Sequence, residues 1–354
     1  MVSVNDGCAI DASAVLRDAI GVIESKRKSI AVVIDAAGRV VGTVSDGDIR
    51  RALLAGHSVE SPVGVAMNLR PLTAPEDAEP HQLLSLLLES RLEAIPVVGP
   101  DSIYRRVAHR DELAGDVSPK GDCPFTAAVI MAGGEGKRLM PLTRATPKPM
   151  IDVGGMPLLE RQIARLVQCG IRRVFLSINY LGHVIEQHFG DGERFGARIE
   201  YLREPSKMGT GGALSLLPRP VGGPLLVING DIVTRSDFLR LGNFHAEEGA
   251  AITLGAVHHH VEIPFGVIDA KANRVLGIRE KPSQRLLCNA GIYALSEPVL
   301  DLVTSETFLN MTDLVELALR AGRKVCVFPI YEFWSDVGTP QDLEAARRHV
   351  ASLE

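Results

Sequence analysis

The residues best suited to chemistry stand together in one stretch, AVIMAGGEGKRLMPLTRATPKPM, at positions 128–150. An apolar run at 126–131 has the length and composition of a buried strand, and three glycines follow it. Glycines directly after a strand let backbone N–H groups close around an anion, because no Cβ stands in the way. Arg138 and Lys148 come next, the lysine between two prolines. The stretch therefore predicts a site that holds a polyphosphate.

Two better-known phosphate motifs are excluded by single residues in this stretch. A dinucleotide-binding fingerprint needs a third glycine where Leu139 stands. A Walker A loop needs Ser or Thr after its Gly-Lys, and Arg138 follows Lys137 here. The glycine-rich turn belongs to neither class.

Two aspartates lie where a metal ion would be useful. Asp231 follows the apolar run at 225–228 after a glycine, and Asp336 precedes a helix that Pro340 begins. Mg²⁺ prefers oxygen ligands and commonly takes one or two carboxylates together with substrate phosphates. Each aspartate alone is an ordinary turn or cap residue. Two such acids from distant parts of the chain could nevertheless make a joint Mg²⁺ site.

Alternating helical and strand patterns must position these groups. The predicted strands after the glycine loop are 174–178, 199–202 and 225–228, and the predicted helices are 158–169, 182–189 and one that starts at Gly209. Alternation of this kind predicts an α/β fold with an open, mostly parallel sheet. Ligands of such sheets bind at the carboxyl ends of the strands, where the loop and Asp231 fall.

The first 120 residues contain a weak internal repeat. Strand-like runs at 30–34 and 40–44 precede a helix that Ser45 or Asp46 caps, and runs at 95–98 and 103–107 repeat the pattern. This predicts a smaller α+β region of two repeats. A stretch rich in Gly, Pro and Asp then leads to the second region. We expect the domains to be 1–117 and 125–354, joined by a linker at 118–124.

Composition narrows the class of protein. A formal net charge of -5 over 354 residues argues against a general nucleic-acid binder. No apolar run approaches the ~20 residues of a membrane span, and the first residues lack the pattern of a secretory signal. Five scattered cysteines, never in CxxC, indicate reduced thiols rather than disulfides or a zinc site. We expect a cytoplasmic protein.

The glycine-rich stretch resembles the signature of the sugar-1-phosphate nucleotidylyltransferases, GGxGxRLxPLT followed by PKPM. The agreement is unbroken at 133–143 and at 147–150. Shorter family-like segments follow in the family's order, namely EPSKMGTGGAL, FGV, EKP, NAGIY and WSDVGT. The resemblance covers about 126–346 and implies a Rossmann-like nucleotidyltransferase sheet.

The resemblance also implies a role for each matching residue. Catalysis falls to Arg138 and Lys148. The residues that would bind the nucleotide are Ala132, Gly133, Gly134, Gly136, Glu204, Gly209 and Thr210. The residues that would bind the sugar phosphate are Gly266, Glu280, Lys281 and Asn289. Asp231 and Asp336 match the family's metal ligands, so Mg²⁺ is the expected cofactor.

The implied reaction transfers a nucleoside monophosphate from a nucleoside triphosphate to a sugar 1-phosphate and releases pyrophosphate. MAGGEGKRLMPLT and NAGIYAL look more like the guanylyl-transferring branch, which makes GTP the favoured donor. Amino-sugar phosphates such as glucosamine 1-phosphate are among the acceptors considered. A thymidylyl-, uridylyl- or cytidylyl-transferring relative is the alternative, as is a non-catalytic module that senses nucleotide sugars.

The segment GTVSDGD at 42–48 resembles the nucleotide-binding element of CBS domains. The resemblance implies a tandem pair that regulates the attached enzyme, with Ser45 near phosphate and Asp48 on the ribose hydroxyls of an adenosine or guanosine nucleotide. Ala108 replaces the expected hydroxyl in the second repeat, so at most one site is expected. The alternative is a pair that only dimerises. In either case we expect a homo-oligomer, a dimer or higher.

Overall fold

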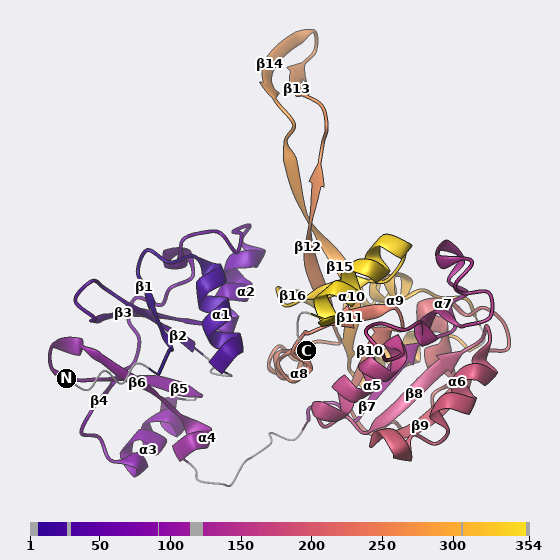
Figure 1. The fold of residues 1–354 in the computed structure, drawn as a ribbon, viewed down its shortest axis with the longest axis horizontal. Helices are drawn as coiled ribbons and strands as arrows, with labels where there is room; N and C mark the ends of the chain where they lie inside the picture. The colour runs from indigo at the N-terminus through magenta and orange to yellow at the C-terminus, as the bar shows by residue number, and fades with distance from the viewer. Residues whose placement is uncertain (1–5, 27–29, 91, 114–122, 306, 352–354) are drawn as a thin grey trace. The chain divides into compact units, whose positions relative to one another are not determined.

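The computed structural model describes residues 6–26, 30–90, 92–113, 123–305 and 307–351 (Figure 1). The chain divides into two compact units, 1–121 and 122–354. Most of the predicted linker lies outside the described residues. Each unit has its own sheets and its own core, and each is described by itself.

The second unit is built on a seven-stranded sheet. In spatial order its strands are β16 (Val325–Ile330), β12 (Ile252–Glu262), β15 (Ser283–Leu295), β10 (Leu225–Asn229), β7 (Ala127–Met131), β8 (Arg173–Ile178) and β9 (Arg198–Arg203). β10, β7, β8 and β9 run parallel, and β15 runs antiparallel to both β10 and β12. The predicted α/β class with a mostly parallel sheet is confirmed.

Helices cover both faces of this sheet. α5 (Leu158–Gln168), α6 (Gly182–Phe189) and α8 (Phe238–Glu247) contribute to one apolar cluster, and α9 (Met311–Arg320) contributes to a second. Successive residues of β7 alternate between the two clusters, Ile130 in the first and Val129 in the second. Burial on both faces explains why β7 reads as a continuous apolar run.

The order of the strands places a crevice beside the glycine loop. From β7 the chain proceeds outward to β8 and β9, and it returns to form β10 on the other side of β7. Loops leaving β7 and β10 therefore diverge at their carboxyl ends, which is where open α/β sheets bind ligands. The glycine loop follows β7, and Asp231 follows β10.

Beside the sheet, a two-stranded ribbon joins β11 (Ile232–Thr234) to β17 (Trp334–Asp336). α10 (Pro340–Ala351) follows β17, as the sequence predicts for a helix begun by proline. An apolar cluster that includes Leu139, Val337 and Leu343 packs this helix against the glycine loop.

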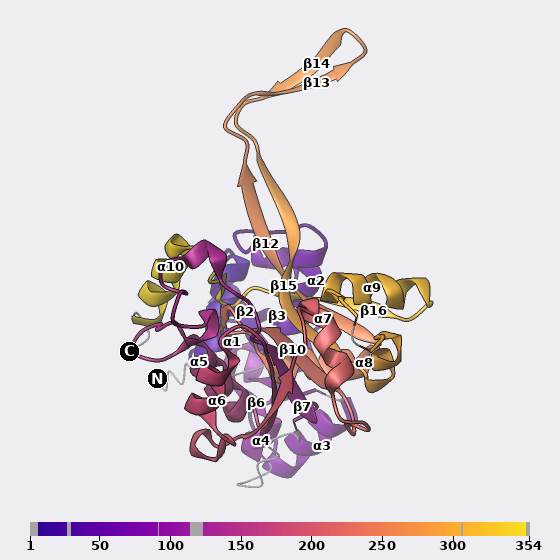
Figure 2. The ribbon, with the colours of Figure 1, turned by 90° about the vertical axis from the view of Figure 1, so that its right-hand side faces the viewer.

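A second ribbon was not expected from the sequence. β12 and β15 continue past the sheet as an antiparallel pair, and β13 (Val267–Lys271) and β14 (Arg274–Arg279) form its outer end. The ribbon stands clear of the sheet and helices of its unit (Figure 2). The FG and EKP segments lie in its two connections.

The first unit repeats one topology twice. Its sheets are β1 (Ala9–Asp11), β2 (Ile30–Ile34) and β3 (Val40–Ser45), then β4 (Ala74–Pro75), β5 (Ala94–Val98) and β6 (Tyr104–His109). In each, the first pair is parallel and the second antiparallel. The helices are α1 (Leu16–Lys26), α2 (Asp46–Leu54), α3 (Pro80–Ser90) and α4 (Arg110–Leu113). Cys8, Val32, Ala94 and Val107 share one core across the repeats.

Candidate active site

The loop after β7 presents unpaired backbone donors. Within the described part of the chain, the amides of Gly133, Gly134 and Gly136 donate no hydrogen bond. Ala132 differs from them, because it is fully buried and its amide donates to the Ser177 carbonyl at 2.9 Å. The three glycine amides can therefore serve an anion, whereas Ala132 fixes the base of the loop.

Gly136 brings the loop against Lys148. Its φ of +62° is left-handed, and a Cβ there would lie 2.9 Å from the Lys148 Cβ. Both the conformation and the space require glycine. Thr143 secures the same turn, since its hydroxyl donates to the Gly136 carbonyl at 2.9 Å.

Lys148 is the central cation of the site. The residue is 8% exposed, and it begins a short 3₁₀ turn (Lys148–Met150) with Pro147 before it and Pro149 after it. Its Nζ forms an ion pair with Asp231 Oδ2 and lies 3.9 Å from Asp336 Oδ1. Proline restricts the backbone on both sides, so the ammonium is held in place before any ligand binds.

Backbone pairing brings the two aspartates together. Ile232 pairs with Asp336 across β11 and β17, and the Val337 amide donates to the Asp231 carbonyl at 2.8 Å. Gly230 makes the approach possible, because a Cβ there would lie 2.6 Å from the Met131 carbonyl oxygen. The carboxyl ends of β7 and β10 and the end of β17 thus meet at one point.

The carboxylates of Asp231 and Asp336 lie close enough to influence each other's charge. Burial raises the pKa of Asp336 above its ordinary value, and the charge of Asp231 raises it further, while Lys148 and Arg138 oppose the rise. Arg138 lies against Gly338, whose Cβ would come 3.1 Å from the guanidinium. Two adjacent carboxylates with two cations beside them form a compact charged cluster.

Asp231 and Asp336 make a donor set that fits Mg²⁺, which proteins commonly bind through one or two carboxylates. Among the described residues, no group of three or more His, Cys, Asp and Glu side chains could hold a metal ion. The other ligands would be phosphate oxygens and water. Arg138, Lys148, Asp231 and Asp336, all predicted from the sequence, are brought together.

A cavity of about 450 Å³ opens beside the cluster. Its size is within the usual range of small-molecule sites, roughly 300–1,000 Å³. The residues that line it are Met131, Gly133, Gly134, Glu135, Gly136, Lys137, Glu204, Lys207, Gly209, Thr210, Asn229, Asp231, Phe308 and Asn310. All the predicted nucleotide-binding residues except buried Ala132 are in this set.

Glu204 holds the far wall of the cavity. Its carboxylate accepts from the Ser177 hydroxyl and, at 3.0 Å, from the Met208 amide. Thr210 makes a similar link, its hydroxyl accepting from the Met311 amide at 3.0 Å. These side chains join β8, β9 and α9 around the cavity, and each oxygen retains a lone pair for a ligand.

Several lining residues were not predicted. Glu135 accepts from Lys207 and Lys137, the latter at 3.1 Å, and the two lysines lower its pKa. This arrangement places two cations at the cavity mouth. Asn229 was within reach of sequence reasoning, since it precedes Gly-Asp231. Phe308 and Asn310 carried no signal, because they come from the segment before α9.

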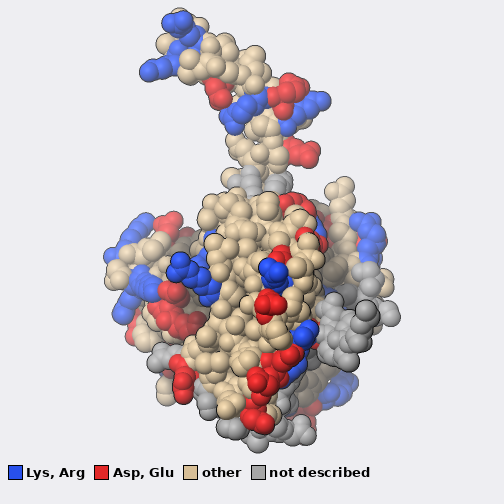
Figure 3. Space-filling model, turned by 90° about the vertical axis from the view of Figure 1, so that its left-hand side faces the viewer, with Lys and Arg blue, Asp and Glu red and all other residues tan. Residues whose placement is uncertain are grey.

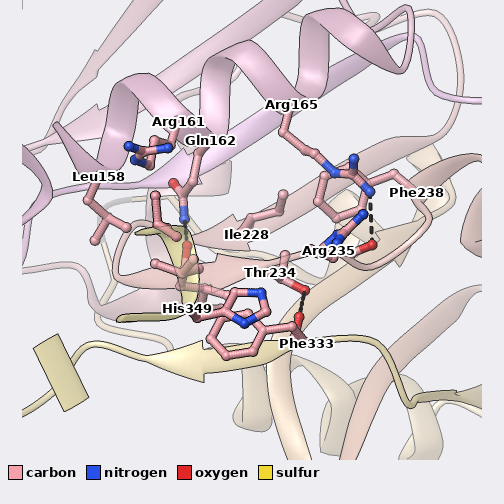
Figure 4. Close-up of a pocket in the computed structure, with 13 residues that line it drawn as sticks. Leu158, Arg161, Gln162, Arg165, Ile228, Thr234, Arg235, Phe238, Phe333 and His349 are labelled. Carbon is pink, nitrogen blue, oxygen red and sulfur yellow. Dashed lines mark hydrogen bonds between the residues drawn. The ribbon is translucent and has the colours of Figure 1, made fainter. Parts of the chain in front are cut away.

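A second cavity, of about 150 Å³, lies beside strand β11 of the β11–β17 ribbon (Figure 4). Gln162 of α5 points into it and is 8% exposed. The Gln162 Nε2 donates to the carbonyls of Asn229 at 3.0 Å and Ile232 at 2.8 Å. Since these carbonyls flank Gly230 and Asp231, Gln162 pins the backbone that carries Asp231. No sequence motif indicated this role.

The residues predicted to bind the sugar phosphate lie in two separate places. Asn289 lies on β15 at the base of the ribbon, where its amide donates to the Tyr293 hydroxyl at 2.6 Å. Gly291 then approaches Asn229, whose Nδ2 would be 2.5 Å from a Cβ at that position. Gly266, Glu280 and Lys281 are exposed and lie farther out on the ribbon, so the structure does not bring them to Asp231.

Ser45 and Asp48 form hydrogen bonds with each other in the first unit. Ser45 caps α2, and its hydroxyl donates to Asp48 Oδ2 at 2.6 Å. The same oxygen accepts from the Ser45 amide at 2.8 Å, and Arg51 pairs with Asp48 Oδ1 at 2.5 Å. The pair therefore forms a capping box. A nucleotide at these residues stays a prediction.

In the described residues, no helix is both long and apolar enough to cross a membrane. The cavity, the cation cluster and the free amides instead describe a site for a small, highly charged ligand, in keeping with the predicted phosphate chemistry.

Known proteins similar to this chain include one whose name specifies a sugar phosphate. Mannose-1-phosphate guanylyltransferase of Mycobacterium tuberculosis is 34% identical over 227 residues, 61% of this chain and 62% of that protein. The bifunctional protein GlmU of Methanococcus aeolicus is 30% identical over 230 residues, 63% and 54% of the two chains. This chain therefore spans 62% of the length of the first relative and 54% of the length of the second.

The fold has solved counterparts. A putative glucose-1-phosphate thymidylyltransferase from Bacillus anthracis superposes with a TM-score of 0.53 at 25% identity, covering 64% of this chain and 96% of that one. A CBS domain model matches residues 8–55, within the first repeat. The model described as nucleotidyl transferase matches residues 127–352, well over half of the chain. This chain belongs to the nucleotidyl transferase family and carries a CBS region ahead of its nucleotidyl transferase domain.

Proposed function

We propose that this protein transfers a nucleoside monophosphate, most readily from GTP, to a sugar 1-phosphate. The observation that carries the proposal is buried Lys148, fixed between Asp231 and Asp336 beside the free amides of the glycine loop. Fixed positive charge next to a carboxylate pair suits a substrate that brings its own phosphates.

The proposed step forms one bond and breaks one. An oxygen of the sugar 1-phosphate attacks the α-phosphorus in line, and the bond from that phosphorus to the bridging oxygen breaks as pyrophosphate leaves. Such a transfer needs positioning and charge neutralisation, with no nucleophile from the protein. The loop amides and Arg138 would neutralise the β- and γ-phosphates. Lys148 would neutralise the charge that develops at the α-phosphate.

Asp231 and Asp336 would hold Mg²⁺, which supplies Lewis-acid neutralisation of phosphate charge when bound. Lys148 is 8% exposed, so its charge acts through a medium less polarisable than water and is screened little by salt. Glu204 and Thr210 would set the position of the nucleoside, since they border the same cavity.

The names of the relatives support guanylyl transfer, and mannose 1-phosphate is the first acceptor to test. Amino-sugar phosphates such as glucosamine 1-phosphate belong in the same panel. The decisive experiment incubates the full chain and Mg²⁺ with each of four triphosphates and a set of sugar 1-phosphates, and measures pyrophosphate. GTP-dependent release is the expected result. Preference for another triphosphate would reassign the base, and nucleotide-sugar binding without release in any pair would identify a sensing module.

A further inference from the structure

The outer part of the β12–β15 ribbon lacks the packing that stabilises strands elsewhere in the unit. β16 pairs with β12 only as far as Val257, and β10 pairs with β15 only from Ile292. In the described residues beyond these pairs, the two strands pair only with each other, and β13 only with β14. A two-stranded ribbon is marginally stable by itself in water, so this one requires a surface to lie on.

The ribbon also exposes apolar side chains. They are Val261, Phe265, Ile268, Val275, Leu276, Ile278, Leu286 and Leu287, with Phe265 73% and Leu276 70% exposed. Ile268 and Ile278 are opposite each other in the β13–β14 pair, so their exposed side chains share one face. Exposed apolar side chains gathered on one face are typical of interaction surfaces. Between the charged groups of the ribbon, uncharged surface is open to solvent along its length (Figure 3).

The ribbon rises from the edge of the sheet that holds the candidate active site. β10 and β12 both run antiparallel to β15, so they point the same way. The ribbon continues β12 past its carboxyl end, and Asp231 follows the carboxyl end of β10. A molecule facing this edge would meet the ribbon and the site together.

The extended ribbon separates residues that one sugar phosphate would have to touch. Pairing runs without interruption from Ala256 with Asn289 to Glu262 with Ser283. At about 3.3 Å per residue, Ser283 to Asn289 spans about 20 Å, and Lys281 lies beyond Ser283. Lys281 and Asn289 of the same chain therefore cannot contact one sugar 1-phosphate in this arrangement.

The base of the ribbon is fixed in this direction. A bulge between β12 and β15 leaves Ala290, Gly291 and Ile292 without a partner in β12. The Gly291 amide donates to Asn289 Oδ1 at 3.0 Å, and the Trp334 indole donates to the Ala290 carbonyl at 2.9 Å. These bonds fix the direction in which the base of the ribbon leaves the sheet.

We infer that the ribbon lies over the candidate active site of a second copy of this chain and supplies Glu280 and Lys281 to it. The inference rests on the proposed function, under which the sugar phosphate needs a cation besides Lys148. The receiving chain offers exposed apolar side chains near its site, namely Met140, Leu142 and Phe308. The ribbon and the receiving surface lie at the same edge of one chain. In a two-fold dimer, each copy can therefore cover the site of the other with its ribbon.

The test mixes two inactive variants. Lys148→Met removes the central cation, and Lys281→Met removes the ribbon cation while leaving a folded, solvent-exposed position. Each variant alone should have a few per cent or less of wild-type pyrophosphate release. Hybrids isolated through two different tags should regain about half of the wild-type dimer's rate, because one of their two sites is intact. Hybrids no more active than the single variants would overturn the proposal, as would a fully active Lys281→Met.

Two further measurements keep this result separate from the proposed reaction. Lys271→Met, at the exposed outer end of the same ribbon, should retain wild-type activity and controls for damage to the ribbon. Hydrogen exchange of the β13–β14 amides requires no turnover. Protection at micromolar protein that is lost on dilution supports the proposal, and fast exchange at every concentration contradicts it. A wild-type chain without transferase activity in any pair would refute the proposed function alone, since the exchange measurement still decides where the ribbon lies.

Discussion

Asp231 and Asp336 are held side by side by a backbone hydrogen bond and a strand pair rather than by their own side chains. The Val337 amide donates to the Asp231 carbonyl at 2.8 Å, and Ile232 pairs with Asp336. Two carboxylates far apart in the sequence therefore move as one unit. Their charges are balanced from one side by Lys148, which contacts both.

Replacing either aspartate by asparagine should reduce turnover at least about 100-fold, because a neutral amide neither attracts Mg²⁺ nor balances Lys148. Asp231→Asn and Asp336→Asn keep the size of the side chain, so the melting temperature should change little. Pyrophosphate release measured against Mg²⁺ concentration checks the assignment. Asp301→Asn, at an exposed carboxylate paired with Arg219, is the matched control. Near-normal turnover of Asp231→Asn at saturating Mg²⁺ would contradict the metal site.

Lys148→Met should lower kcat by about 100- to 1,000-fold and change KM for the triphosphate much less. The reason is that a fixed ammonium is needed most where charge develops in the transition state. Lys207→Met provides the contrast, because Lys207 is 63% exposed at the cavity mouth and pairs with Glu135. Its loss should raise KM with little effect on kcat. If Lys148→Met showed only a KM effect, Lys148 would be a binding residue.

Sequence patterns were enough to predict features whose structure is determined within one short segment. The apolar run of β7 and the glycines after it predicted a strand and a phosphate loop, and Gly136 requires both its conformation and its space. Asp231 and Asp336 were predicted from their own motifs. The place of Asp231 follows from the carboxyl-end rule for parallel sheets, which needs only the order of strands and helices. Asp336 reaches it through the pairing of β11 with β17, which no sequence pattern indicated.

Features that depend on distant pairing could not be predicted in the same way. The sequence at 258–287 mixes polar and apolar residues without a clean alternation, so nothing in it signals a ribbon. The extension exists because β12 and β15 remain in register past the sheet. Gln162 was missed for a similar reason: its role depends on α5 lying beneath carbonyls of a remote strand end.

Gln162→Met should test whether pinning the backbone matters for turnover. Methionine fills nearly the same volume but cannot donate to the carbonyls of Asn229 and Ile232. The free energy of unfolding should fall by about 1–3 kcal/mol, the cost of leaving buried acceptors unpaired. We also expect a lower kcat with little change in KM, since Asp231 would lose its fixed position. A stability loss with unchanged kcat would show that Gln162 is only structural.

Stability of the second unit should fall as the pH drops below about 6.5, because of His245. Its ring contacts the Thr253 and Ser296 hydroxyls at 2.9 and 3.0 Å, and burial lowers its pKa from the ordinary value. The folded state thus keeps the ring neutral while the unfolded chain takes up a proton. This favours unfolding from pH 6.5 down to the lowered pKa. Urea unfolding at pH 7.5 and 5.5 should show a smaller pH effect for His245→Asn than for the wild type. An equal pH effect in both would contradict the role of His245.

A nucleotide site at Ser45 and Asp48 predicts a regulatory response that a mere capping box would not give. Asp48→Asn keeps an oxygen for the Ser45 amide, so α2 should remain capped, but it removes the charge that would bind ribose hydroxyls. A typical coupling of about 1–3 kcal/mol corresponds to a change of fivefold or more in affinity at the second site. Calorimetry on the full chain with AMP, ATP, GMP and GTP should show one binding event per chain besides any at the candidate active site. This event should be absent in Asp48→Asn, together with a several-fold change in activity. Asp18→Asn is the matched control, because Asp18 accepts from the Val15 amide at the start of α1 and should leave both responses intact. If no nucleotide binds at millimolar concentration outside the candidate active site, the first unit is better explained as a dimerisation domain. Ser45 and Asp48 would then only cap α2.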